Sequence, residues 1–275
     1  MGSPNLSLEG KLAVVTGAAG KNGMGAAIAR LFAQAGADVA ISDIIAEGDD
    51  RNIDRVVKEI QALGRRSIGI QGDVSRKADV EGMVAQVIDE LGPIDILVNN
   101  AGILGKGILN DMQEDDWDRV LDTNLKGSYL CAQAVAPGMM ERKQGAIVNV
   151  ASINAHEAVP GRVGYCTSKA GITMLTRVLA LDLGRYNIRV NAISPGAMRT
   201  DMGQHKLDTG KEPAAMSDAA RERMDAYFTG KIPLGRMADP REMASAALFL
   251  ASDAASYISG VTLPVDGGWT AGWLS

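Results

Sequence analysis

Residues 11–36 read KLAVVTGAAGKNGMGAAIARLFAQAG, an apolar strand that leads directly into a glycine-rich turn and then a helix. Glycine lets the backbone turn tightly and approach a pyrophosphate, and the exposed amides of a helix N-terminus favour negative charge. The turn is richer in glycine than a plain connection needs, with Gly17, Gly20, Gly23 and Gly25. A triphosphate-binding loop is excluded, because Asn22 rather than Ser or Thr follows Lys21. The stretch therefore predicts a dinucleotide-binding turn at the start of an α/β sheet.

Short apolar strands and longer helices alternate along the rest of the chain. Strands are expected at 11–16, 38–42, 67–71, 95–99, 146–151 and 188–194, and helices at 23–36, 52–63, 77–91, about 114–142 and around Tyr165. Strands that are apolar on both faces and separated by helices are typical of a parallel sheet covered on both sides. The expected fold is therefore α/β, a doubly wound parallel sheet of the Rossmann type with seven strands, whose ligand crevice lies at the carboxyl ends of the strands.

No internal repeat or linker divides the sequence, so we expect a single dinucleotide-binding catalytic domain over residues 1–275. The main irregular stretch is about 195–217, rich in Gly, Met, Asp and Lys. A loop of this length in a compact domain is usually a lid or a binding loop. A substrate-binding loop is therefore expected at about 195–230.

Composition argues against several kinds of partner. The 28 basic and 33 acidic residues give a formal net charge of -5 without long runs of either sign, which disfavours nucleic acid and anionic membrane surfaces. The start MGSPNLSLEG lacks the pattern of a signal peptide, and no segment has the apolar length to span a bilayer, so we expect a cytoplasmic enzyme. Cys131 and Cys166 lack metal-ligand spacing and are expected to be free thiols, and no metal site is predicted.

The second strand leads to Asp43, eighteen residues after Gly25, close to the distance at which an acid meets the adenosine ribose. A carboxylate there accepts hydrogen bonds from the two ribose hydroxyls and repels a 2′-phosphate. Lys21, inside the glycine loop, is a cation that could reach a 2′-phosphate and so favours NADP. Ile44 and Ile45, however, supply no second positive charge after the strand. The sequence therefore predicts NAD as the cofactor in preference to NADP.

A second informative feature is the pair Tyr165 and Lys169, with Ser152 thirteen positions before the tyrosine. Residues four apart on a helix share a face, so the phenol and the ammonium can meet over one patch of substrate. A free tyrosine has a pKa near about 10, and a neighbouring cation favours the phenolate and lowers that value. The spacing makes Tyr165 a candidate acid/base.

These motifs occur with several others, each at the end of an expected strand or in a helix: Asp73-Val74, Asn99-Asn100-Ala101-Gly102, Asn124 and Pro195-Gly196 with Thr200. Together they resemble the short-chain dehydrogenase/reductase family, in its single-domain NAD(P)-dependent oxidoreductase branch. The resemblance covers nearly the whole chain, from Leu8 to the segment 265–268.

The resemblance implies roles for individual residues. Asp73 and Val74 would contact the adenine, Asn100 would line the adenosine ribose, and Thr200 with the backbone of 195–198 would hold the nicotinamide carboxamide. Lys169 would also bind the nicotinamide ribose. Asn124 would interrupt its helix and position a water that relays protons to Lys169.

One departure from the family lies in the glycine motif. The family usually separates the first two glycines of Thr-Gly-x-x-x-Gly-x-Gly by three residues, whereas five residues separate Gly17 from Gly23 here. The start of the helix is intact, so we expect the cofactor to be bound by Gly17, Asn22, Gly23 and Met24. This is an insertion of two residues, and it leaves the contacts of residues 18–22 open.

The implied reaction is hydride transfer between NAD(H) and a secondary alcohol or its ketone, with Tyr165 as acid/base, Lys169 tuning the tyrosine, Ser152 bonding the substrate oxygen and Asn124 in support. Residues expected near the pocket mouth are Asn154, His156, Met198 and Met202, with Ile153, Arg162 and His205. A polyol, a hydroxy acid or ester, and a cyclic or terpenoid alcohol all stay open. Arg162 or Arg199 could bind an anionic substrate, although a surface or interface role is expected for each.

The family resemblance also implies a homotetramer, with the two long helices pairing across one two-fold axis and the C-terminal strands across another. Rival functions are a non-catalytic NAD-binding sensor or scaffold, an NADP-dependent ketoreductase such as a 3-oxoacyl reductase, and an epimerase or enoyl reductase on a related fold. A sensor is disfavoured because Ser152, Tyr165 and Lys169 are all present. Enoyl reductases space their tyrosine and lysine more widely.

Overall fold

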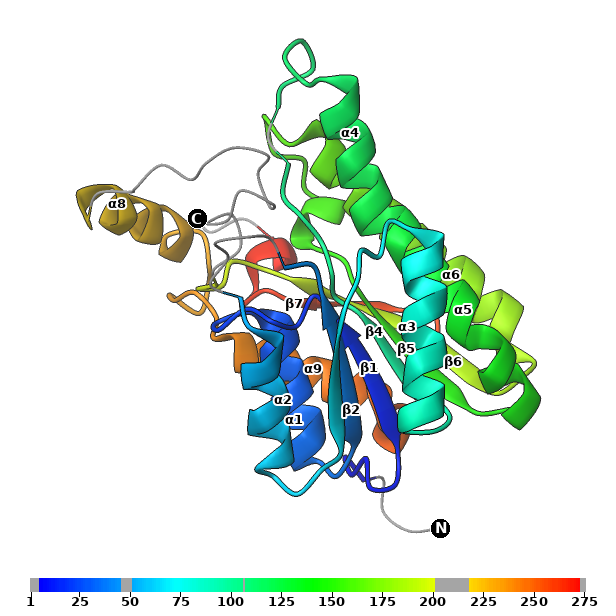
Figure 1. The fold of residues 1–275 in the computed structure, drawn as a ribbon. Coiled ribbons are helices and arrows are strands. Elements are labelled where there is room, and N and C mark those ends of the chain that lie inside the picture. Colours follow the sequence, from blue (N-terminus) through cyan, green and yellow to red (C-terminus); the bar gives the residue numbers. More distant parts are fainter. Residues whose placement is uncertain (1–4, 46–50, 106, 201–217, 273–275) are drawn as a thin grey trace.

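A computed structural model describes residues 5–45, 51–105, 107–200 and 218–272. Its centre is a parallel sheet in the order β3-β2-β1-β4-β5-β6-β7 (Figure 1). The strands are β1 (Leu12–Thr16), β2 (Asp38–Asp43), β3 (Ser67–Gln71), β4 (Ile96–Asn99), β5 (Gly145–Val150), β6 (Ile188–Pro195) and β7 (Thr262–Val265). The predicted doubly wound sheet of seven strands is confirmed, and its order reverses between β1 and β4, where such sheets bind ligands.

Helices cover both faces of the sheet. One layer contains α1 (Met24–Gln34), α2 (Ile53–Gln61) and α9 (Pro240–Ala251), and the other contains α3 (Lys77–Glu90), α5 (Gly127–Arg142) and α6 (Val163–Gly184). Two shorter helices, α4 (Glu114–Leu121) and α8 (Asp218–Thr229), extend beyond the layers at the end of the sheet where the strands finish (Figure 1). The region between α4 and α8 is where the ligand crevice is expected.

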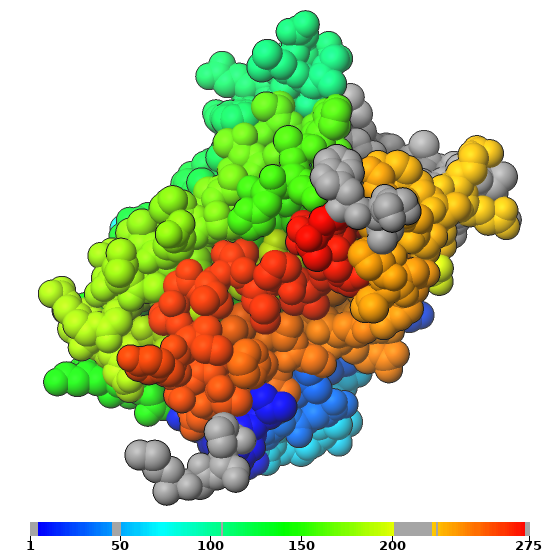
Figure 2. Space-filling model, turned by 180° about the vertical axis from the view of Figure 1, so that it is seen from behind, coloured from blue at the N-terminus to red at the C-terminus, as the bar shows by residue number. Residues whose placement is uncertain are grey.

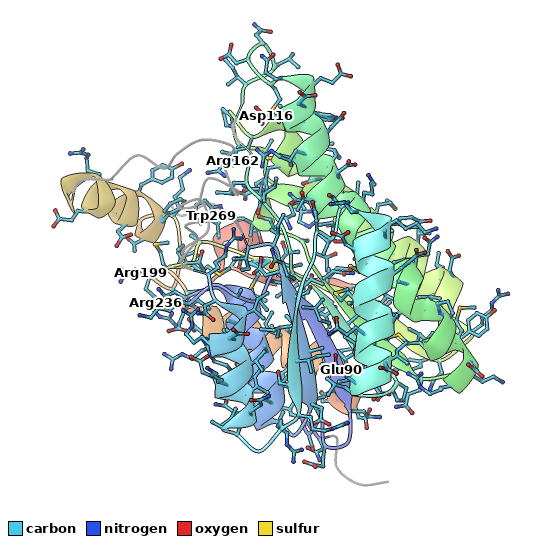
Figure 3. All side chains as sticks on the ribbon, in the orientation of Figure 1. Glu90, Asp116, Arg162, Arg199, Arg236 and Trp269 are labelled. Carbon is cyan, nitrogen blue, oxygen red and sulfur yellow. The ribbon has the colours of Figure 1, made fainter. Side chains whose placement is uncertain are left out.

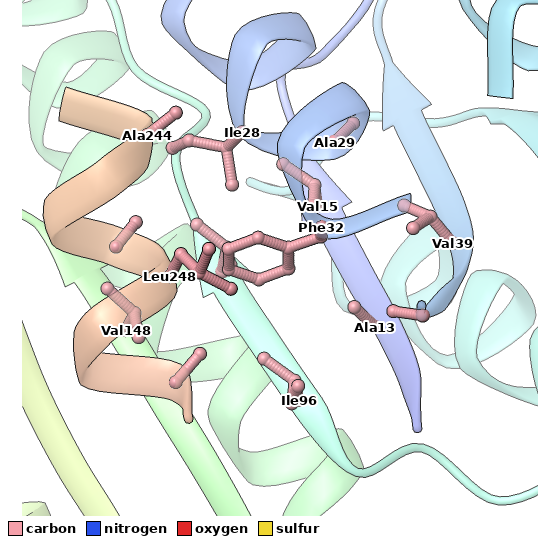
Figure 4. Packing of buried hydrophobic residues seen from close by; sticks show 14 of the residues in the cluster. Ala13, Val15, Ile28, Ala29, Phe32, Val39, Ile96, Val148, Ala244 and Leu248 are labelled. Atoms are coloured by element: carbon pink, nitrogen blue, oxygen red, sulfur yellow. The ribbon is translucent and has the colours of Figure 1, made fainter. Parts of the chain in front are cut away.

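The core explains why α1 and α9 pack side by side on one face. Phe32 of α1 is fully buried and lies among Ile28, Val15 and Leu248, the last of these from α9 (Figure 4). Strand positions such as Val14 and Leu97 point to the opposite layer and belong to its cluster. Strands that bury both faces carry apolar residues at successive positions, which is why the sequence shows runs rather than alternation.

Two expected segments contain further structure. The expected helix at about 114–142 is interrupted by a π-helical turn, Asp122–Lys126, between α4 and α5, where the family resemblance implied an interruption at Asn124. The substrate-binding loop expected at 195–230 contains α8 at residues 218–229, while residues 201–217 lie outside the described part of the chain. Within the described residues, none of the helices is long and apolar enough to cross a membrane.

Candidate active site

The glycine turn after β1 is built from two kinds of glycine. Gly17 has φ +65° and a Cβ there would stand 2.7 Å from Cα of Ala101, while a Cβ on Gly25 would collide with the Asn100 side chain and the Gly17 carbonyl. Both positions therefore require glycine for packing. At Gly20 and Gly23 a Cβ would meet its nearest neighbours at 3.6 and 3.5 Å, ordinary contact distances. Packing does not demand glycine at these two positions, so they are free to admit a ligand close to the backbone.

The loop after β4 holds this turn in place. Asn100 Nδ2 donates to the carbonyls of Thr16 and Gly17, each at 2.8 Å. The Thr16 hydroxyl in return accepts from the backbone N–H groups of Asn100 and Ala101, each at 3.1 Å. Asn100 thus links the glycine turn after β1 to the loop after β4.

The start of α1 fits a pyrophosphate. Gly23 at the N-cap supplies no side-chain hydrogen bond, and the first turn carries no acidic residue. The first backbone N–H groups of α1 are therefore available to donate to an anion, and Gly20 and Gly23 let the anion come close to the backbone. These donors and the open glycine surface match the diphosphate of a nicotinamide dinucleotide, the group that the sequence predicts, with Asn22 and Met24 flanking Gly23.

Asp43 lies at the end of β2 beside this turn, but its surroundings differ from the expectation. Its Oδ2 accepts from the Ala19 N–H at 2.8 Å, and Arg51 Nη1 lies 3.5 Å from its Oδ1. The argument for NAD considered only the two residues that follow Asp43, and the structure brings a positive charge to it from another residue. Ile44 and Ile45 carry none, but Arg51 folds back from eight residues further along the chain.

The remaining residues assigned to the cofactor lie along the carboxyl edge of the sheet. Asp73 follows β3, where its Oδ1 accepts from the Ser75 N–H at 2.9 Å, and Val74 beside it is buried. Thr200 lies five residues beyond the end of β6 and is half-buried. Their contacts with adenine and carboxamide stay predictions.

The residues of the predicted catalytic group come together at the end of β5. Ser152 follows this strand, and Tyr165 and Lys169 lie on α6; their exposed fractions are 7%, 7% and 2%. Lys169 Nζ donates to the Val150 carbonyl at 2.8 Å and lies 5.7 Å from the centre of the Tyr165 ring. The Ser152 side chain is close enough to the Tyr165 phenol to act on its pKa. The arrangement is a buried phenol with a hydroxyl and an ammonium nearby.

The pKa values of this group are governed by burial. Burial raises the pKa of Tyr165, while the hydrogen bond with Ser152 and the positive charge of Arg162 act in the lowering direction. Burial also lowers the pKa of Lys169 to about 8. Desolvation of the phenolate outweighs the Ser152 and Arg162 contacts, and the lowering of the tyrosine pKa by Lys169 stays a prediction.

Asn124 is fully buried in the π-helical turn. Its Oδ1 accepts from the Ile103 N–H at 2.8 Å, and its Nδ2 donates to the Ile103 carbonyl and to Ser168 Oγ, each at 3.0 Å. A Cβ on Gly102 would lie 3.2 Å from Asn124 Oδ1 and 3.4 Å from Lys169 Nζ, so these two polar groups flank the same glycine. The proton relay through a water is a proposal that this proximity supports.

Only some of the expected substrate residues lie in the part of the chain that the structure describes. Asn154 is half-buried, and its backbone N–H donates to Ser152 Oγ at 3.1 Å. His156 is exposed. The backbone of Met198 forms an isolated parallel β-bridge with Ala238. Met202 and His205 lie outside the described residues.

Arg162, at the N-cap of α6, influences Tyr165, whereas Arg199 pairs with Asp225 of α8 at 2.9 Å. Figure 3 places Arg162 in the region between α4 and α8.

A group of contacts that the sequence did not predict joins three segments: the one that carries Trp269, helix α8, and the loop that follows Ser152. Trp269 Nε1 donates to Glu157 at 2.7 Å, and its ring lies 6.0 Å from that of Phe228 on α8. Lys231 Nζ stands over both Tyr227 and Trp269, at 4.7 and 5.7 Å from the ring centres. Trp269, which Figure 3 labels, therefore links α8 to the loop that follows Ser152. The aromatic residues of the C-terminal tail are the sequence signal that could have pointed to this contact.

Fold and site together define an oxidoreductase that uses a nicotinamide dinucleotide and acts on CH–OH or keto groups. A family model described as "Enoyl-(Acyl carrier protein) reductase" matches residues 17–270. The chain belongs to the short-chain dehydrogenase/reductase family.

Individual relatives carry different activities. The chain is 40% identical over 263 residues to the 3-oxoacyl-[acyl-carrier-protein] reductase FabG of Thermotoga maritima, covering 96% of this chain and 99% of the relative. It is also 40% identical over 263 residues to the (2S)-[(R)-hydroxy(phenyl)methyl]succinyl-CoA dehydrogenase subunit BbsD of Thauera aromatica, covering 96% and 98%. A gluconate 5-dehydrogenase from Burkholderia cenocepacia, solved in complex with NADP and tartrate, superposes with a TM-score of 0.84 at 32% identity and 98% coverage of both chains.

Proposed function

We propose that the protein interconverts a secondary alcohol and its ketone, with Tyr165 as the acid/base. The observation that carries the proposal is that Ser152, Tyr165 and Lys169 are all buried at the end of β5, with Lys169 Nζ 5.7 Å from the centre of the Tyr165 ring. The nicotinamide ring, when bound, supplies or accepts the hydride, so the chain itself has to manage one proton and the orientation of the substrate.

Proton transfer falls to Tyr165. In ketone reduction its phenol donates the proton to the substrate oxygen, and in alcohol oxidation the phenolate receives that proton. Ser152 hydrogen-bonds the same oxygen and orients it, and the Lys169 ammonium stabilises the phenolate left after donation. Because burial raises the tyrosine pKa, the resting residue carries its proton at neutral pH, the form that reduction needs.

The substrate proposed is an anionic one, a hydroxy acid or the corresponding oxo acid. Arg162 supports this class, because its charge acts on Tyr165 and, among the residues that the structure describes, no carboxylate forms an ion pair with its guanidinium. The tartrate in the gluconate 5-dehydrogenase complex is an acid of this kind. Reduction of a 3-oxoacyl thioester is the second candidate, favoured by the FabG relative.

The cofactor proposed is NAD(H), on the position of Asp43 at the end of β2. NADP(H) is the second candidate, favoured by the NADP complex of the gluconate 5-dehydrogenase and by Arg51 beside Asp43. The assembly proposed is a homotetramer, and the location proposed is cytoplasmic.

The function is tested by following the absorbance of the reduced nicotinamide with a panel of hydroxy acids, neutral secondary alcohols and 3-oxoacyl thioesters. We expect turnover with hydroxy or oxo acids. Tight dinucleotide binding without turnover of any member of the panel would favour a sensor instead.

A further inference from the structure

Helix α8 is weakly attached to the body of the molecule. Figure 1 shows it extending away from the sheet and from both helix layers, and none of its described residues belongs to the buried apolar clusters of the core. The ion pair of Asp225 with Arg199 joins side chains that are 37% and 71% exposed, and exposed pairs of this kind hold an element weakly. The position of α8 therefore depends on its other contacts.

The last turn of α8 contacts Trp269. The Trp269 ring lies 6.0 Å from that of Phe228, and Lys231 Nζ, just after the helix, lies 5.7 Å from the centre of the Trp269 ring. The same ammonium lies 4.7 Å from the centre of the Tyr227 ring, which is in edge-to-face contact with Phe228 at 5.4 Å. Aromatic pairs and cation–π contacts are favourable and directional, so this group of rings places the end of α8 against Trp269.

The segment that carries Trp269 is itself fixed at the edge of the sheet. It follows β7, where the Asp266 carboxylate accepts from the backbone N–H groups of Gly268 and Thr270, each at 2.9 Å, and from the Thr270 hydroxyl at 2.6 Å. A Cβ on Gly196, directly after β6, would lie 2.7 Å from Cα of Asp266, so the two strand ends are in close contact. Trp269 therefore meets α8 from a defined position.

On its other side, Trp269 contacts the loop that follows Ser152. Trp269 Nε1 donates to Glu157 Oε2 at 2.7 Å, and the carboxylate charge strengthens this hydrogen bond. The Glu157 N–H donates to the Ile153 carbonyl at 2.9 Å, and the Asn154 N–H donates to Ser152 Oγ at 3.1 Å. A continuous series of contacts thus joins Ser152 to α8 through Glu157 and Trp269.

Resting on the proposed function, we propose that Trp269 is a positioning residue for the substrate, because it fixes α8 relative to Ser152 through its hydrogen bond with Glu157. The ligand crevice is expected between α4 and α8, so the placement of α8 decides how well a substrate fits beside Ser152. A helix that is in place before binding spares the substrate the cost of ordering it. The glycine turn after β1 lies outside this series of contacts, so the role concerns substrate affinity rather than cofactor affinity.

The test combines hydrogen exchange with steady-state kinetics on the intact protein. Trp269→Phe keeps an aromatic ring and removes the Nε1 donor, while Glu157→Ala removes the acceptor. In both variants we expect the backbone amides of α8 and of residues 153–157 to exchange about threefold or more faster, because local opening meets less resistance. KM for the best substrate of the panel should rise by about five- to tenfold, while kcat and the dinucleotide dissociation constant stay within about threefold.

Three further variants separate this role from a general loss of structure. Glu157→Gln keeps a carbonyl acceptor for the indole N–H, and its KM should stay within about twofold of the wild type. The double variant Trp269→Phe/Glu157→Ala should be no worse than either single variant, since both changes remove the same hydrogen bond. Glu222→Ala, which removes an exposed carboxylate from α8 itself, is the matched control and should change neither exchange nor KM.

Unchanged exchange of α8 in Trp269→Phe would overturn the proposal, as would an unchanged KM or fully additive effects in the double variant. A parallel loss of substrate and dinucleotide affinity would also overturn it, because it would show a structural role only. Absence of turnover with every member of the panel is a failure of the proposed function. The exchange of α8 still decides in that case whether Trp269 holds the helix.

Discussion

At the scale of single residues, the buried phenol and ammonium predict a definite pH profile. The rate of alcohol oxidation needs the Tyr165 phenolate, whose population increases with pH towards its raised pKa, and the Lys169 cation, which is lost above about 8. We expect kcat/KM for oxidation to increase through neutral pH and to level or fall above about 8. In Lys169→Arg the alkaline decline should disappear, because arginine keeps its charge. An unchanged decline in this variant would assign it to another group.

A second prediction at the scale of single residues concerns the role of Arg162 in binding an anionic substrate. Arg162→Ala should raise KM for an anionic hydroxy acid by about ten- to a hundredfold and leave the KM of a neutral secondary alcohol within roughly threefold. It should also move the oxidation profile to higher pH, since the Arg162 charge lowers the pKa of Tyr165. Arg199→Ala is the matched control, because Arg199 pairs with Asp225 on α8. A loss shared equally by charged and neutral substrates would reject the anion-binding role.

At the scale of elements, the glycine turn contains glycines that packing requires, such as Gly25, and glycines that packing does not require, such as Gly20. Gly25→Ala should destabilise the fold by about 1–3 kcal/mol, because its Cβ meets Asn100 and the Gly17 carbonyl. Gly20→Ala has room for the methyl group and should unfold like the wild type while binding dinucleotide more weakly. Chemical denaturation and cofactor titration of both variants measure the two effects. Equal stability of the two variants would contradict this division.

Elements also show where prediction from sequence succeeds and where it ends. Apolar runs predicted the strands closely, since burial on both faces leaves a pattern in the sequence. The π-helical turn at Asn124 was expected only through the family resemblance, because one shifted backbone hydrogen bond leaves no such pattern. Arg51 escaped prediction for a different reason. Its contact with Asp43 depends on the path of the chain between β2 and α2 rather than on local spacing.

At the scale of the whole molecule, the exposed apolar side chains predict where subunits meet. Tyr129 on α5 and Met174, Val178 and Leu181 on α6 are 43%, 55%, 46% and 83% exposed, more than solvent-facing helices usually allow. Figure 2 shows α6 lying along the C-terminal segment on one face. Tyr257 and Val261 of that segment are also exposed. Two apolar surfaces of this kind support the proposed homotetramer.

Leu181→Asp should weaken this assembly, because it buries a charge wherever α6 meets a second copy. Sedimentation velocity is expected to give tetramers for the wild type and smaller species for the variant. Leu109→Asp, which also changes a highly exposed leucine but in the segment between β4 and α4, is the control. A wild type that sediments as a monomer would contradict the proposed assembly.

The central claim is that Tyr165 transfers the proton, and Tyr165→Phe tests it most directly. This variant removes one oxygen and keeps the ring that packs over Lys169. Turnover of the best substrate, measured through the reduced nicotinamide, should fall by roughly a thousandfold, while the dinucleotide dissociation constant from direct titration stays within about threefold of the wild type. Turnover near the wild-type rate in Tyr165→Phe would contradict the account.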